Sequence, residues 1–238
     1  MHFYRPLNSI KAITFDLDDT LYDNAPYMVQ AVDQMMAEIQ RIDGLQHCQL
    51  AEFDQVKRDI LNEQPELYHD VIVWRVCTIK QFLRKQGISD SAIIERITDD
   101  AMSAFIYWRN QIEVPDDSHQ ILKQLAKHYP LVVITNGNAE ISKIGLQMYF
   151  KFALRAGADG LSKPYPDLFW LAAKRLAIHP QHVLHIGDNL QTDVAGAINS
   201  GMLACWLNVT GQDIYHCRDA SVLPHMEITH LSALNCLL

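Results

Sequence analysis

The sequence predicts an α/β protein: a largely parallel sheet with helices on both faces, interrupted after its first strand by an all-helical insertion. In the second half of the chain, short apolar runs rich in strand formers alternate with amphipathic helical stretches. Between about residue 21 and residue 114 no such run occurs, and apolar residues recur at helical steps. We therefore expect residues 1–20 and 115–238 to form the sheet unit and residues 21–114 to form the insertion.

The first strand is predicted at residues 12–15, a short apolar run followed at once by Asp16, Asp18 and Asp19. A buried strand here delivers carboxylates at its C-terminal end. In the insertion that follows, the clearest helical spacing precedes Gly87, a residue that commonly ends helices. The residues with that spacing are Ile72, Val76, Ile79 and Leu83.

Helix and strand then alternate to the end of the chain. Pro130 stops a predicted helix directly before an apolar run, and Pro180 separates the next helix from the next run. This order is typical of parallel sheets, whose strands are joined by helices. The predicted helices are residues 118–129, 167–177 and 193–200, and the predicted strands are residues 131–134, 183–186 and 203–207.

The composition argues against nucleic-acid and membrane partners. The chain has 238 residues, and its formal net charge of -8 would repel a nucleic-acid backbone or an anionic membrane surface. Its five cysteines form no CxxC pair or zinc-type spacing, which favours a reducing compartment. We read no export signal and no membrane span. We therefore expect a cytoplasmic protein, a monomer or weak dimer, with a small-molecule partner and no nucleic acid or membrane partner.

Polar side chains follow several predicted strands, and ligands of open α/β sheets bind beyond the carboxyl ends of the strands. Of two aspartates separated by one residue, one can attack phosphorus while the other handles the proton of the leaving group. We assign Asp16 as the nucleophile and Asp18 as the general acid that later acts as general base. Thr135 and Asn136, after another strand, can donate hydrogen bonds to phosphate oxygens.

A carboxylate that attacks a phosphate dianion needs positive charge nearby, because two unit charges ~5 Å apart repel by roughly 3 kcal/mol at an effective dielectric of ~20. Asp16 and Asp188 offer the hard oxygen ligands that Mg²⁺ prefers, with Asp193 behind them. Lys163 supplies a compact cation, and its backbone is restricted by Pro164. The predicted cofactor is therefore Mg²⁺.

Taken singly, each pattern also has an ordinary structural explanation. Asp18 and Thr20 can cap a turn, and residues 135–137 resemble a strand-to-loop turn. Lys163 alone could be a solvated surface lysine. Asp188 can be a turn residue and Asp193 a first-turn helix aspartate. Their joint order along the chain favours a site.

Four segments, taken together, resemble the motifs of the haloacid dehalogenase superfamily. They are residues 15–20, 134–137, 162–164 and 187–193. The resemblance implies a Rossmann-like core, a helical cap of the C1 type, and the roles assigned above. It also implies the backbone carbonyl of Asp18 as a magnesium ligand, with Asp193 and Thr20 supporting the ligands. The dehalogenases of this superfamily lack an acid at the place of Asp18, so its presence favours phosphatase or phosphomutase chemistry.

Further likeness is narrower: residues 17–24, 68–75 and 154–157 resemble bacterial phosphatases of flavin metabolism. This implies FMN and the riboflavin precursor 5-amino-6-(5-phospho-D-ribitylamino)uracil as substrates. Trp74 and Arg75 can offer a flat ring an aromatic face and a planar donor, and Tyr68, seven residues before Arg75, is expected on the same helical face. Helix packing explains this pair equally well, and the same holds for Trp108 and Arg109.

Two histidines near the fourth motif, His182 and His185, are three residues apart across a predicted strand. Their side chains are expected on opposite faces, so they cannot easily share a metal ion, and we interpret both as structural or solvent-facing. Three alternatives to a flavin-pathway phosphatase stay open: a phosphatase of another sugar phosphate or nucleotide, a phosphomutase, and a non-catalytic sensor of phosphate ligands.

Overall fold

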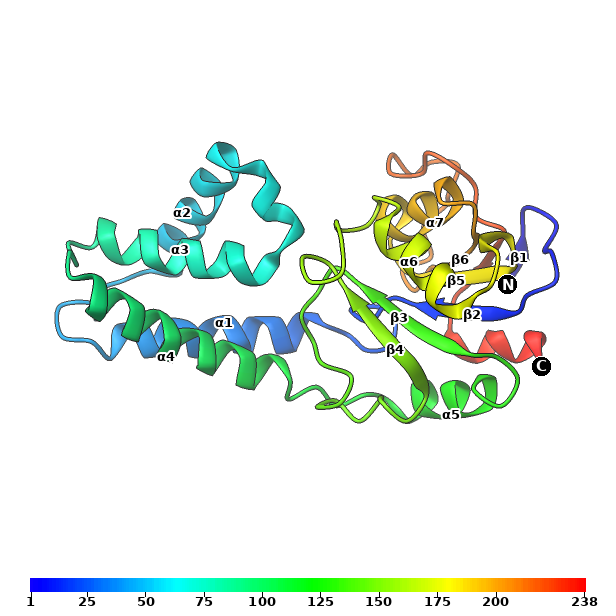
Figure 1. Cartoon of the computed structure of the whole chain (residues 1–238), viewed down its shortest axis with the longest axis horizontal. Coiled ribbons are helices and arrows are strands. Elements are labelled where there is room, and N and C mark those ends of the chain that lie inside the picture. The colour runs from blue at the N-terminus through cyan, green and yellow to red at the C-terminus, as the bar shows by residue number, and fades with distance from the viewer. The chain divides into compact units, whose positions relative to one another are not determined.

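The structure is a computed structural model that describes residues 1–238, and the chain divides into two compact units (Figure 1). One unit comprises Met1–Asp23 and Glu113–Leu238, and the other comprises Asn24–Ile112. The second unit is thus inserted into the first shortly after its first buried strand. No helix of the chain combines the length and apolar character that a membrane crossing would need.

The first unit is built on a seven-stranded sheet with the order β1-β7-β6-β5-β2-β3-β4. All neighbouring pairs from β7 to β4 are parallel, and only the short β1 is antiparallel to β7. The predicted α/β class with a parallel sheet is therefore confirmed. The strands are β1 His2–Phe3, β2 Ala12–Phe15, β3 Leu131–Thr135, β4 Phe150–Arg155, β5 Val183–Gly187, β6 Leu203–Leu207 and β7 Met226–Ile228.

Helices cover both faces of this sheet, with α6 and α7 on one side and α5 and the C-terminal η4 on the other (Figure 1). Because both faces are covered, the central strands β2, β3, β5 and β6 are buried along their whole length. This explains their nearly continuous apolar sequences. The helical elements are α5 Asp116–Leu125, α6 Asp167–Leu176, η2 Pro180–His182, the π-helical η3 Leu190–Ala195, α7 Gly196–Asn199 and η4 Leu231–Leu237.

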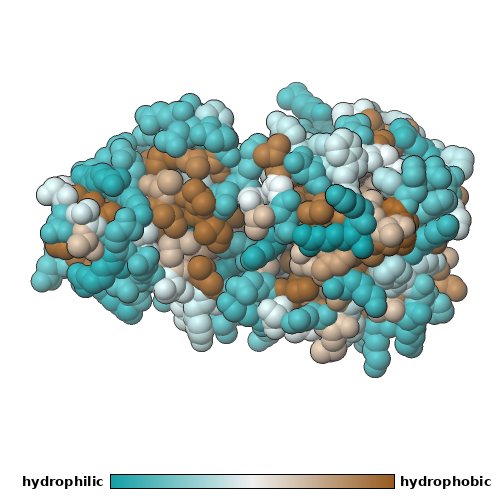
Figure 2. Space-filling view, viewed as in Figure 1, coloured by the Kyte–Doolittle hydropathy of each residue, from teal (hydrophilic) through white to brown (hydrophobic).

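The second unit is entirely helical. It has a separate core of its own, which includes the buried side chains of Met35, Phe53, Phe82 and Phe105. Figure 2 shows that further apolar residues of this unit also reach its surface. Asp70 begins one helix by accepting hydrogen bonds from the backbone N–H groups of residues 72 and 73, both at 3.0 Å. The elements are α1 Ala25–Gln40, α2 Leu50–Glu63, η1 Pro65–His69, α3 Val71–Lys85 and α4 Ser91–Arg109.

Several sequence expectations need correction. Tyr68 and Arg75 do not share one helical face, because Asp70 ends η1 and caps the separate helix α3. The helix expected at residues 193–200 begins earlier, as the wide turns of η3 followed by α7. The sequence analysis placed no strand at β1, β4 or β7. Two of these strands are very short, and β4 carries exposed or half-buried polar residues that interrupt its apolar pattern.

Candidate active site

Asp16 directly follows β2, in the middle of the sheet. Its backbone N–H donates to the carbonyl oxygen of Ile186 at 2.9 Å, so the parallel pairing with β5 extends to this residue. The residue is only 7% exposed. Burial raises the pKa of Asp16 well above its ordinary value, and Lys163 opposes that rise. A buried carboxylate at this position therefore requires positive charge beside it to stay ionised.

Lys163 provides that charge. Its ammonium group donates to Oδ1 of Asp16 and to Oδ1 of Asp193, each at 2.6 Å. Burial alone would lower the pKa of Lys163, but the two carboxylates outweigh it and hold the pKa above its ordinary value. The ammonium group has three hydrogens, and two are used here. The third is left to bind an anion.

Asn136 holds the backbone of Lys163 in place. Its Nδ2 donates to the Lys163 carbonyl oxygen at 3.0 Å, and its Oδ1 accepts from the Lys163 N–H at 2.7 Å. The side chain that we expected to donate to a phosphate thus positions the cation. Any phosphate contact from Asn136 must use its backbone N–H or the second hydrogen of its amide.

Asp193 lies beneath the ammonium group and is held through both oxygens. Oδ1 accepts from Lys163 and lies 3.1 Å from Nε2 of His185, and Oδ2 accepts from the backbone N–H of Asn189 at 3.0 Å. Burial would raise the pKa of Asp193, but Lys163 and His185 hold it well below its ordinary value. A Cβ on Gly187 would come within 2.3 Å of the Asp193 carboxyl carbon. Glycine is therefore required for this close contact.

Asp18 is placed by a local contact and by a second glycine. The hydroxyl of Tyr22 donates to Asp18 Oδ1 at 2.6 Å. Asp18 Oδ2 lies only 2.3 Å from where a Cβ of residue 137 would stand, so Gly137 gives the carboxylate room. The backbone between Asp16 and Asp18 thus carries two carboxylates in the same hollow.

Asp188 follows β5 and is half-buried. Its Oδ1 accepts from the hydroxyl of Thr20 at 3.2 Å. Burial, with Asp193 nearby, raises the pKa of Asp188 to about 6. Oxygen atoms of Asp16, Asp188 and Asp193 lie within 4.8 Å of one another. Three converging carboxylates exceed the charge of one ammonium group, so the donor set fits a hard divalent cation.

Asp193 is the weakest ligand of these three, because both of its oxygens are already used by Lys163, His185 and Asn189. Asp16 and Asp188 are the better candidates to hold a metal ion. The carboxylates line a hollow of ≈ 180 Å³. Its remaining lining residues are Asp18, Asp19, Thr135, Asn136, Gly137, Lys163, Asn189 and Thr192. Thr135 accepts from the Gly137 N–H at 2.9 Å, which leaves its own hydroxyl hydrogen available.

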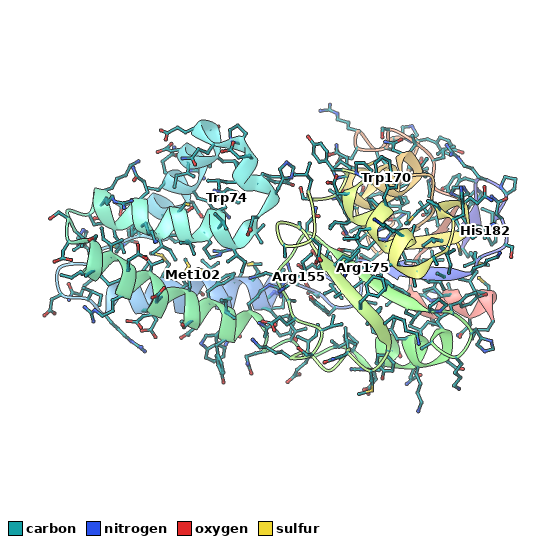
Figure 3. All side chains as sticks on the ribbon, viewed as in Figure 1. Trp74, Met102, Arg155, Trp170, Arg175 and His182 are labelled. Atoms are coloured by element: carbon teal, nitrogen blue, oxygen red, sulfur yellow. The ribbon has the colours of Figure 1, made fainter.

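In the helical unit, the three residues expected to bind substrate have different surroundings. Tyr68 is 48% exposed. Trp74, labelled on α3 in Figure 3, donates through Nε1 to the Lys57 carbonyl oxygen at 3.1 Å, and the Lys57 ammonium lies 4.6 Å from the centre of its ring. Arg75 is buried, with its guanidinium 3.7 Å from the centre of the Phe105 ring.

Arg75 forms no ion pair at contact distance. Burial, with Arg109 nearby, lowers its pKa to about 10, although the more distant carboxylate of Asp54 opposes that fall. Buried guanidinium groups are ordinarily paired directly with acids. The guanidinium of Arg75 instead packs on the ring of Phe105.

His185, interpreted from the sequence as structural or solvent-facing, is buried beside Asp193, and its Nδ1 lies 2.8 Å from Oγ1 of Thr14. His182, labelled in Figure 3, is the last residue of η2, immediately before β5, and its Nδ1 lies 2.7 Å from the Ser9 carbonyl oxygen. The strand period correctly separates the two histidines, but only the register of β2 with β5 shows what His185 faces.

Comparison with known proteins identifies the family. The family model described as haloacid dehalogenase-like hydrolase matches residues 10–201, which include every carboxylate described above. The chain belongs to the haloacid dehalogenase-like hydrolases. A relative in Escherichia coli strain K12, the 5-amino-6-(5-phospho-D-ribitylamino)uracil phosphatase YigB, is 44% identical over 239 residues, covering 100% of both chains.

Other similar proteins carry different names. The glyceraldehyde 3-phosphate phosphatase of Pyrococcus furiosus is 27% identical, covering 84% of this chain and 81% of that protein. A solved structure described as 2-haloacid dehalogenase from Pseudomonas syringae pv. Tomato DC3000 superposes with a TM-score of 0.88 at 34% identity, covering 96% of this chain and 97% of that chain. Family membership therefore establishes a hydrolase, and the site must indicate which bond is cleaved.

Proposed function

We propose that this hydrolase is a Mg²⁺-dependent phosphomonoesterase that works through an aspartyl-phosphate on Asp16. The observation that carries the proposal is the arrangement around Asp16: a cation at 2.6 Å with one donor left, and a second carboxylate, Asp18, lining the same hollow. The full-length likeness to a named phosphatase at 44% identity supports it.

In the first half-reaction, a carboxylate oxygen of Asp16 attacks phosphorus and the bond from phosphorus to the leaving oxygen breaks. Asp18, in its protonated form, gives its proton to that oxygen, so the leaving group departs as a neutral alcohol. The third hydrogen of the Lys163 ammonium and the Thr135 hydroxyl donate to the phosphoryl oxygens. These donors offset the repulsion between the nucleophile and the dianion.

In the second half-reaction, Asp18 is a carboxylate and accepts a proton from a water molecule. The water oxygen attacks phosphorus, the bond between phosphorus and Asp16 breaks, and inorganic phosphate is released. Tyr22 donates to Asp18 Oδ1 and fixes the orientation of the carboxyl group. One residue thus serves as acid and then as base, and the site returns to its initial state.

Asp16 and Asp188, with the backbone carbonyl of Asp18, would hold the magnesium ion. When bound, the ion supplies positive charge next to the phosphoryl oxygens. Thr20 orients Asp188 through its hydroxyl. Asp193 acts on Lys163 instead, because its oxygens are occupied by hydrogen-bond donors. The raised pKa of Asp188 and the burial of Asp16 are the features of the chain that favour a cation here.

For the physiological substrate we propose 5-amino-6-(5-phospho-D-ribitylamino)uracil, with FMN as a second substrate. Both carry a pyrimidinedione, whose oxygens are acceptors for a planar donor. In the helical unit Arg75 forms no ion pair at contact distance and packs on Phe105, and Trp74 and Tyr68 add aromatic surface. We propose that these three residues recognise the ring of the leaving group.

A dehalogenase is the second candidate, because the structure that superposes with a TM-score of 0.88 bears that name at 34% identity. Carbon–halogen cleavage by an aspartate releases halide and needs no general acid. The second carboxylate, Asp18, and the acidic set around Asp188 have no evident role in that reaction. We therefore favour phosphate ester hydrolysis.

A substrate panel tests the proposal. The full-length protein is incubated with the ribitylaminouracil phosphate, FMN, a sugar phosphate or 2-chloropropionate, with Mg²⁺ or with EDTA, and released phosphate and chloride are measured. We expect Mg²⁺-dependent phosphate release, with the highest kcat/KM for the two ring-bearing esters. Chloride release without phosphate release would overturn the proposal in favour of the dehalogenase. Isomerisation of the sugar phosphate without phosphate release would indicate a mutase.

A further inference from the structure

A buried imidazole lies directly beneath the charged groups of the site. His185 is 1% exposed and sits in β5, where its register partner is Thr14 of β2. Its ring packs edge-on against Phe169, with centroids 5.0 Å apart and planes at 89°. The ring is therefore fixed in orientation by packing, and both of its nitrogens have polar partners.

The partners decide which nitrogen carries the hydrogen. Burial lowers the pKa of His185, so the ring is neutral and has one N–H. Nε2 lies 3.1 Å from Oδ1 of Asp193, a carboxylate that can only accept, so Nε2 must be the donor. Nδ1 then has a free lone pair, and the Thr14 hydroxyl, 2.8 Å away, donates to it. The two contacts together are compatible with a single tautomer of the neutral ring.

The result is a chain of hydrogen bonds that returns to the strand on which it starts. It runs from the Thr14 hydroxyl through His185 to Asp193, and from there through the Lys163 ammonium to Asp16. Thr14 and Asp16 are two residues apart on the same strand, so both side chains point to one face of the sheet. Each link has a defined donor and acceptor.

We propose that His185 is a positioning residue for the Lys163 ammonium, acting through Asp193, and that Thr14 sets the tautomer of His185 that makes this possible. The proposal rests on the proposed phosphatase function, in which the third hydrogen of the ammonium binds the phosphoryl group. The direction of that hydrogen depends on where Asp193 Oδ1 lies. His185 Nε2 donates to that same oxygen and so helps to fix its position.

The test compares three variants in a Mg²⁺-dependent assay with an aryl phosphate. His185→Leu removes the donor and should lower kcat by ~10- to 100-fold while KM changes less than about threefold, because the link acts on the orientation of a charged donor. His185→Gln places an amide N–H near the position of Nε2 and should recover most of the lost kcat. His182→Leu, in η2 just before β5, is the matched control and should keep the wild-type kcat.

A spectroscopic measurement tests the tautomer of His185 independently of any enzyme assay. Long-range ¹H–¹⁵N correlation on the wild-type protein should show His185 protonated on Nε2 and unprotonated on Nδ1, and Thr14→Val should weaken that preference. A ring protonated on Nδ1 would overturn the proposal. So would a His185→Gln variant as impaired as His185→Leu, or a folded His185→Leu variant with wild-type kcat. If the wild-type protein hydrolysed no phosphomonoester, the proposed function would fail, and the tautomer measurement would still decide the hydrogen-bond chain.

Discussion

Lys163 in the α/β unit and Arg75 in the helical unit are both buried cations, but their surroundings differ sharply. Lys163 donates to two carboxylates at 2.6 Å, which hold its pKa above the ordinary value. Arg75 stacks on Phe105 without a carboxylate at ion-pair distance, and its pKa falls to about 10. One charge is in direct contact with two carboxylates, whereas the other is attracted by Asp54 only from a greater distance.

The difference indicates two tasks. A cation held between carboxylates is pre-organised for a reacting group that every substrate shares, such as a phosphoryl group. A cation with free donors can adapt to a ligand that brings its own acceptors, at a cost in the stability of the free protein. We therefore expect substitution of Lys163 to abolish turnover for every substrate. Substitution of Arg75 should instead change which substrates are preferred.

Removal of the nucleophile should have the largest effect. Asp16→Asn is expected to lower kcat by at least ~10³-fold for all esters, because the amide cannot form the aspartyl-phosphate. The fold should persist, since relief of a buried charge offsets the lost ion pair. Phosphate release and circular dichroism check this. A variant that retains more than a few per cent of wild-type activity with Mg²⁺ would remove Asp16 from the nucleophile's role.

Removal of the compensated cation should affect both activity and stability. Lys163→Met leaves Asp16 and Asp193 buried and facing each other, so we expect the unfolding free energy to fall by about 3–5 kcal/mol. We also expect the variant to lose turnover on every substrate. Urea denaturation at pH 7 measures the stability. If the variant were as stable as the wild type, the two carboxylates would not depend on Lys163, and the contrast with Arg75 would disappear.

Removal of Arg75 should not lower stability, and its effect on activity should depend on the substrate. Arg75→Met is expected to leave stability unchanged or to raise it by up to about 2 kcal/mol, because a buried charge without a contact ion pair is replaced by an apolar side chain of similar length. The kcat/KM for FMN should fall at least ~10-fold more than that for an aryl phosphate. Arg84→Met, an exposed residue of the same helix, serves as control and should change neither quantity. Equal losses for both substrates would contradict a role in ring recognition.

The smallest effect is expected at Asp188. Its pKa in the metal-free protein is raised to about 6, so the folded state binds more protons than the unfolded state between pH ~4 and pH ~6, and stability falls as pH rises through that window. At pH 7.5 in EDTA, Asp188→Asn should therefore raise stability by about 1–2 kcal/mol after solvent screening, and below pH ~4 the gain should vanish.

Thermal unfolding with and without Mg²⁺ checks this prediction. The wild-type protein should gain thermal stability from the cation, and the Asp188→Asn variant should lose most of that gain. An equal Mg²⁺-dependent gain in both proteins would place the metal ion elsewhere.

How well each strand could be predicted from the sequence depended on how completely it is buried. The fully buried strands β2, β5 and β6 were recognisable because burial on both faces leaves an uninterrupted apolar run. The edge strand β4 was not, because one side of it meets solvent and its residues are mixed. Helix bounds shifted where tertiary contacts extend or trim the last turn, as at α5.

The site, too, could be predicted from the sequence only in part. The approach of Asp16, Asp188 and Asp193 could be expected because parallel strands end at one edge of the sheet. The clamp of Asn136 on the Lys163 backbone could not, since it joins two loops whose conformations no local pattern specifies. His185 resembled an ordinary core residue, and only the register that sets it opposite Thr14 shows otherwise.

The central position of β2 in the sheet has a consequence for synthesis on the ribosome. Its neighbours β3 and β5 begin at residues 131 and 183, so this strand emerges first and waits for both partners. The helical insertion, by contrast, is one continuous segment that needs nothing from later parts of the chain to close its own core. A nascent polypeptide thus carries its reactive carboxylate from the start but no complete set of charged partners until Asp193 has left the exit tunnel.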